Sequence, residues 1–131
     1  MSLKLLLTIS GVLEVLAGLA ALISPAAVIS LLLGSPADTP ALVVARLFGA
    51  AAFALGLACL KARDDVGTPA GAAVSIGITA YNVSAAVVLI WAAAGLSLGG
   101  HLLWAAGIGH AVLGALFVSA LAATRRSLKR E

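Results

Sequence analysis

Long apolar runs constrain this chain more than any other feature of its sequence. Four stretches of roughly 20 residues or more are almost free of charged side chains, and short segments with Pro, Gly and charged residues separate them. About 20 apolar residues suffice to cross the hydrocarbon core of a bilayer as an α-helix. Because lipid offers the backbone no hydrogen-bonding partner, a crossing run of this kind must be helical. The sequence therefore predicts an all-α integral membrane four-helix bundle.

Composition supports this class and excludes several others. Hydrophobic residues make up 63% of the chain and charged residues 10%, whereas a soluble domain is about 45–50% apolar and about 25% charged. These values exclude a soluble globular domain and a disordered tail. The net charge of +3 is explained by basic residues at span ends, so we expect no nucleic-acid partner. The single Cys59 excludes an internal disulfide, a Cys-x-x-Cys redox pair and a multi-Cys metal site.

The whole chain, residues 1–131, is expected to form one transmembrane domain. The first run contains Glu14 and lacks a clear small-x-small cleavage site, so we expect it to be retained and not removed as a signal peptide. Pro25 predicts a kink, or a short extra helix that Gly34 ends. The expected spans are residues 3–23 followed by 25–33, then 40–62, 69–94 and 101–124.

Three dipeptides resemble helix starts, because each pairs a capping residue with Pro at the first helical position. They are Ser24-Pro25, Thr39-Pro40 and Thr68-Pro69.

Basic residues predict the orientation of the spans. Seven of them fall on one side of a four-span topology: Lys4, Lys61, Arg63, Arg125, Arg126, Lys129 and Arg130. The other side carries Asp38 and His101, and Trp91 and Trp104 fall near its interface. By the positive-inside rule both termini are cytoplasmic, which is the expectation for a bacterial cytoplasmic membrane.

Polar residues within the spans are the candidates for function, because such residues are costly in a membrane. They are Glu14, Arg46, Asn82 with its neighbour Tyr81, and His110. Counting 1.5 Å per residue from the cytoplasmic ends places Glu14 at a depth of about 15 Å and Asn82 at about 21 Å. Arg46 and His110 both fall at about 22 Å. Small residues at helical spacing flank each of them, which predicts a polar layer facing inward.

Each of these residues also has a purely structural interpretation. Glu14 either pairs with Arg46, directly or through water or ligand, or is a protonated structural group. Arg46 would otherwise extend to the outer interface. Asn82 is equally an interhelical hydrogen-bonding residue, Tyr81 a packing residue and His110 a hydrogen-bonded core histidine. His101 is about half a turn out of phase with His110, so no metal site is expected.

If the layer is chemical, its residues divide into catalytic and ligand-binding roles. Glu14 would carry or donate a proton and His110 would be its partner. Arg46 would hold an anionic or carbonyl oxygen, Asn82 would orient a polar headgroup, and Tyr81 lies beside it. This set suits a lipophilic small molecule with one polar end, such as a quinone-, isoprenoid- or sterol-like compound. No cofactor is expected, and whether the chain is an enzyme stays open.

Two families resemble parts of the chain. Ala45-Arg46-Leu47-Phe48-Gly49 through Gly56-Leu57 to Lys61 resembles the second span of DoxX-like small bacterial membrane proteins. That resemblance implies a four-helix protein and, for some members, a link to quinone-dependent oxidation. Leu13-Glu14-Val15 with Gly18 is similar to the first span of small multidrug resistance transporters, although residues 78–82 lack the aromatic, Trp-containing motif of that family.

The sequence leaves two other functions open. One is a proton-coupled small-molecule transporter that uses Glu14 and works as a homodimer, because four spans enclose little space. The other is a structural or assembly subunit of a membrane complex, in which the polar layer only specifies helix packing.

Overall fold

The computed structural model describes residues 1–128, and this part of the chain is helical throughout apart from its connecting loops. Four of its helices are long and apolar enough to cross a membrane, so the expected helical class and the number of spanning-length helices are confirmed. The expected tail residues Lys129, Arg130 and Glu131 lie outside the described residues, as does the side chain of Arg125. In chain order the helices are α1 (Leu3–Ile23), α2 (Pro25–Leu33), α3 (Thr39–Ala62), α4 (Pro69–Gly95) and α5 (Leu103–Leu128).

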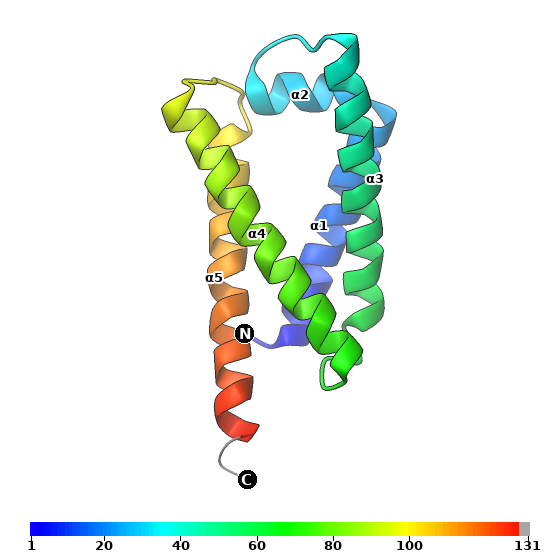
Figure 1. Ribbon diagram of the computed structural model, residues 1–131, viewed down its shortest axis with the longest axis vertical. Helices are drawn as coiled ribbons and strands as arrows, with labels where there is room; N and C mark the ends of the chain where they lie inside the picture. Colours follow the sequence, from blue (N-terminus) through cyan, green and yellow to red (C-terminus); the bar gives the residue numbers. More distant parts are fainter. Residues whose placement is uncertain (129–131) are drawn as a thin grey trace.

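Helix α2 is short and lies across one end of the molecule, between the end of α1 and the start of α3 (Figure 1). Pro25 stands at its first turn, so the chain restarts a helix there instead of extending α1. Gly34 ends α2 with φ of 72°, a left-handed conformation that favours glycine.

Side-chain caps fix the starts of α1, α3 and α4. The caps expected at Ser24 and Thr39 are wrong. The Thr68 hydroxyl accepts a hydrogen bond from the Gly71 amide at 3.1 Å, as the Thr-Pro pattern predicts. At α3 the cap is Asp38 and not Thr39, because the Asp38 carboxylate accepts from the Ala41 amide at 2.9 Å. A carboxylate at this position also complements the positive end of the helix dipole. Ser24 makes no side-chain cap, and its amide instead closes α1 by donating to the Ala20 carbonyl.

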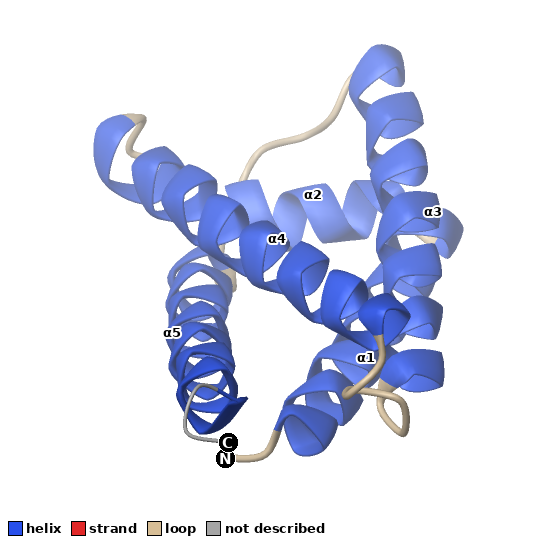
Figure 2. Cartoon of the chain, turned by 60° about the horizontal axis from the view of Figure 1, so that its bottom comes forward, coloured by secondary structure: helices blue, strands red, loops and turns tan. Residues whose placement is uncertain are grey.

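The long helices form two pairs, α1 with α3 and α4 with α5, and contacts within each pair far exceed those between pairs. Helix α4 runs diagonally, starting beside α1 and α3 and ending beside α5 (Figures 1 and 2). The chain therefore builds two antiparallel hairpin-like units and not four equivalent neighbours.

Glycine lets the backbones of α1 and α3 approach closely. A Cβ added at Gly49 would lie 2.8 Å from the Gly18 carbonyl oxygen, and one added at Gly56 would lie 2.8 Å from the Gly11 carbonyl oxygen. No side chain fits at these points without moving a backbone. Close approach at small residues is the usual way helices associate in lipid, where the hydrophobic effect gives no preference for helix over lipid.

A core at the end that holds both termini joins all four long helices. Leu6 and Leu7 of α1, Cys59 of α3, Ile78 of α4 and Phe117 of α5 are fully buried there. A second cluster at the other end takes its buried residues from α4 and α5 only. The two pairs are therefore packed together at one end, and at the other they are joined through α2.

Polar contacts close both ends of the molecule. At the end holding the termini, Lys4 Nζ lies 2.6 Å from Asp64 Oδ1, and Arg63 Nε lies 3.5 Å from Asp64 Oδ2. At the other end, the Leu102 amide donates to the Leu31 carbonyl of α2 at 3.0 Å.

Candidate intramembrane polar site

Glu14 is the most deeply placed carboxyl group of the described chain. Its side chain is 5% exposed, and its place on α1 is one turn from Ser10 and Gly18 on the buried face. Glu14 faces the second helix pair, where it is hydrogen-bonded to the side chain of Tyr81 on α4. Glu14 thus makes a polar contact between the two pairs.

Asn82 and His110 form a direct hydrogen bond between α4 and α5. His110 Nδ1 lies 2.9 Å from Asn82 Oδ1, and Asn82 Nδ2 donates to the Ile78 carbonyl at 2.9 Å. Since Asn82 Nδ2 is a donor, Oδ1 must accept, and the proton of the neutral His110 ring is assigned to Nδ1. The other ring nitrogen, Nε2, then carries a lone pair and serves as a base or acceptor.

Tyr81 connects these two groups of residues. Its ring meets the His110 ring edge to face, with centroids 5.5 Å apart and an interplanar angle of 86°. Its hydroxyl bonds Glu14, as described above. Four of the five predicted site residues are therefore contiguous across α1, α4 and α5: Glu14, Tyr81, Asn82 and His110. We call these four residues the polar cluster.

Arg46 does not join the polar cluster. Its side chain is exposed, and among residues 1–128 no hydrogen bond or ion pair joins it to another residue. Arg46 therefore does not face inward as expected, and a direct Glu14–Arg46 pair is absent from residues 1–128. The reason is geometric, because Gly49, one turn along α3, packs against the α1 backbone and leaves no room there for a long side chain. Arg46 lies seven residues from Thr39, about 10 Å along the helix, within reach of the membrane interface at the start of α3.

Ser10 is a buried polar residue that lies one turn before Glu14 on α1 and is not among the predicted site residues. It is 1% exposed, and its hydroxyl oxygen has no hydrogen-bond partner among the described residues. A buried hydroxyl without a partner loses its hydration free energy with no compensation. The sequence signal was its spacing of four residues from Glu14, but only packing shows that nothing in the described chain satisfies it.

His101 lies outside this site. It is exposed in the turn before α5, well separated from His110 along the chain. Within residues 1–128, no group of three His, Cys, Asp or Glu side chains gathers as metal ligands would.

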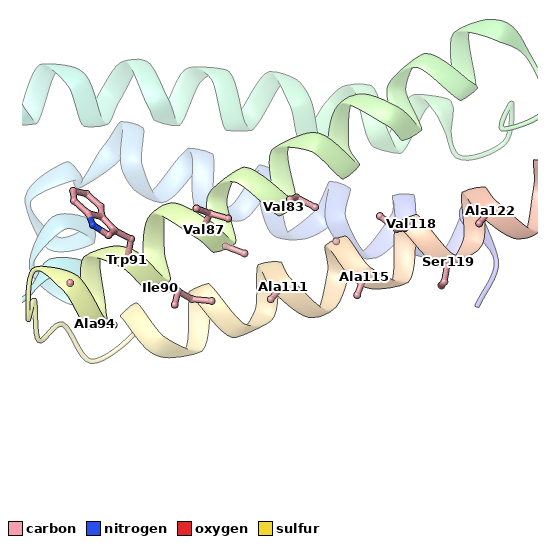
Figure 3. A pocket seen from close by; sticks show the side chains of 13 residues that line it. Val83, Val87, Ile90, Trp91, Ala94, Ala111, Ala115, Val118, Ser119 and Ala122 are labelled. Atoms are coloured by element: carbon pink, nitrogen blue, oxygen red, sulfur yellow. The ribbon is translucent and has the colours of Figure 1, made fainter.

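An apolar groove runs between α4 and α5. It has a volume of about 1030 Å³, and Val83, Val87 and Ile90 of α4 line it opposite Ala111, Ala115 and Val118 of α5 (Figure 3). None of the four cluster residues lines it. Gly114, which lines the groove, packs close to Val83 and Asn82. The groove therefore adjoins the polar cluster, but its lining is formed by other residues.

The position of the polar cluster in the fold is as informative as its composition. Asn82 is one turn beyond Ile78, and His110 is two turns before Phe117, so both follow directly on the core that joins the four helices. Beyond this level, the buried residues of α1 are Gly18 and Ala21, and both contact α3. The cluster therefore lies directly beyond the apolar core that joins the four helices, on the side toward α2.

Comparison with known proteins gives no relative from which a function can be carried over. No family model, curated protein or solved structure matches the chain.

Proposed function

We propose that this chain is an integral membrane protein that binds a lipophilic small molecule with one polar end. The observation that carries the proposal is the polar cluster, in which a carboxyl group, a phenol, an imidazole and an amide meet across three helices at membrane depth. Ionisable residues in such positions are costly and usually mark a functional site. The long apolar helices around the cluster suit a molecule that arrives from the bilayer.

A lipophilic molecule would reach the polar cluster laterally, between the two helix pairs. Because the core residues that join the pairs lie near the start of α1, entry would be beyond that core, on the side toward α2. Its polar end would stop at Glu14 and His110, because the fully buried Ile78 and Phe117 close the path further on.

Acid–base chemistry is within the reach of the polar cluster. Glu14 would exchange a proton with a bound polar group, and His110 Nε2 would accept one while Asn82 holds the ring orientation through Nδ1. An isomerase or a cyclase acting on a lipid would use such a pair. The assigned tautomer supports His110 as the base in this scheme.

Native mass spectrometry of protein released from mild detergent tests ligand binding directly. We expect a small molecule to remain bound to the wild-type chain and to be lost from the Glu14→Gln, His110→Gln double variant. Arg46→Gln is the matched control, because Arg46 lies outside the polar cluster and should leave retention unchanged. Retention by a folded double variant would contradict the proposal and favour a structural subunit.

A proton-coupled transporter is the second candidate, favoured by the continuous contacts from Glu14 through Tyr81 to His110. Such a chain of titratable groups would carry a proton between the helix pairs. Proteoliposome uptake that follows an imposed pH gradient and is lost in Glu14→Gln would support this candidate. Flux independent of the gradient would exclude it.

We further propose that both termini are cytoplasmic and that the membrane is a bacterial cytoplasmic membrane. The support is the charge distribution, since Lys4, Lys61 and Arg63 lie at the end of the molecule where α1 begins and α3 ends. The resemblance of residues 45–61 to DoxX-like proteins agrees with this proposal.

A further inference from the structure

The hydrogen-bonding groups left free around the polar cluster define which polar end a ligand can present. Tyr81 is engaged with Glu14, and the Asn82 amide already bonds both Ile78 and His110. The groups that remain are the Glu14 carboxyl oxygens, the lone pair of His110 Nε2 and the unpartnered Ser10 hydroxyl. Most of these groups are acceptors.

No cation in the described part of the chain contacts these acceptors. Arg46 is exposed away from them, and Lys4 and Arg63 pair with Asp64 at the end of the molecule. An anionic headgroup would therefore lie beside a carboxyl group and an imidazole lone pair in a region of low dielectric, without a compensating charge. Desolvating an anion under these conditions is strongly unfavourable.

We infer that the polar cluster selects a lipophile whose polar end donates hydrogen bonds and carries no negative charge, a hydroxyl or an amine. This inference rests on the proposed function and names the class of its ligand. A hydroxyl donates its proton to Glu14 or His110 and accepts from Ser10, which satisfies the one buried side-chain oxygen that lacks a partner in residues 1–128. Ser10 is well placed for this, one helical turn before Glu14 on the same face of α1.

The test compares three probes that share one saturated chain and differ only in the polar end: cetyl alcohol, cetylamine and palmitate. The full chain is reconstituted in phosphatidylcholine nanodiscs, and retention of each probe is measured by native mass spectrometry. We expect the alcohol and the amine to be retained at least about tenfold better than palmitate, which corresponds to about 1.4 kcal/mol. Palmitate retained as well as the alcohol would overturn the inference.

Variants assign the selectivity to the site. Ser10→Ala should lower retention of the alcohol several-fold and spare the amine, whereas Glu14→Gln should lower retention of the amine most. Arg46→Gln is the matched control and should change neither, and circular dichroism verifies that each variant is folded. Palmitate retention that is lost in Arg46→Gln would also overturn the inference, because it would place a cation at the polar end.

The outcomes separate the inference from the proposed function. Palmitate bound in a Glu14-dependent manner would keep the site and reject its proposed selectivity. Failure of all three probes to bind folded protein would reject both. Retention of the alcohol alone or of the amine alone would support the class and identify which donor the site takes.

Discussion

Charged residues of this chain fall into two environments with opposite energetics. Lys4 and Asp64 form an ion pair in which the side chains are 64% and 58% exposed, so water screens the pair and limits its contribution to stability. Glu14, 5% exposed, has only neutral hydrogen-bonding partners among the described residues. The Lys4–Asp64 pair joins the start of α1 to the loop between α3 and α4. A buried Glu14 is energetically costly in an apolar bundle, and such residues are usually functional.

The pKa of Asp64 gives a prediction about a single ion pair. The hydrogen bond from Lys4, then the charges of Lys4 and Arg63, hold the pKa of this carboxyl group below its ordinary value. A lowered folded-state pKa means that the pair stabilises the fold above the unfolded value of about 3.9, and that this contribution is lost as the pH falls through the lowered pKa. We expect Lys4→Met to raise the pKa of Asp64 toward its ordinary value, measured by a carboxyl NMR titration in micelles.

Lys61→Met serves as the control for that titration, because no described contact joins Lys61 to Asp64. An equal shift in both variants would show that general charge, and not the Lys4 contact, sets the pKa of Asp64.

The interface between α1 and α3 depends on the absence of side chains at four glycines. Gly11 and Gly18 on α1 face Gly56 and Gly49 on α3, and each pair brings a carbonyl oxygen against the position where a Cβ would stand. The spacing of seven residues on both helices keeps the glycines on one face over two turns. Replacing any of these four glycines with a residue that carries a side chain must push the helices apart.

Gly49→Leu is therefore expected to destabilise the fold by about 1–3 kcal/mol, the usual range for overpacking a tight interface. Gly109→Leu is the matched control, because a Cβ at this helical position meets nothing within 4 Å, and surface substitutions usually stay within about 0.5 kcal/mol. The free energy of unfolding in mixed micelles, titrated with dodecyl sulfate, provides the measurement. Equal losses in the two variants would contradict the described α1–α3 contact.

The whole molecule consists of two helix pairs held together more firmly at one end than at the other. Core residues from four helices meet near the termini, whereas α2 and the loop before α5 make the connection at the far end. Contacts between the pairs are far fewer than those within each pair. This architecture leaves the polar cluster beside the core that joins the pairs.

The proposed orientation predicts the outcome of topology reporters on this whole-molecule scale. A fluorescent protein fused to the C-terminus should fluoresce, because it would fold in the cytoplasm, and alkaline phosphatase at the same place should be inactive. Phosphatase inserted in the loop after α4, at Ser97, should be active. The reverse pattern would contradict the positive-inside assignment of both termini.

The sequence by itself determined the helical class and the number of spanning-length helices, because apolar length and the backbone's need for hydrogen bonds act locally. Counting residues also placed Asn82 and His110 at nearly the same depth, but only the tertiary structure shows the hydrogen bond between them. The rotation of each helix about its own axis could not be predicted from the sequence, because small residues flank interior and exterior polar groups alike. Only the packing of Gly49 against α1 excluded Arg46 from the interior, and only the pairing of helices left Ser10 unsatisfied beside Glu14.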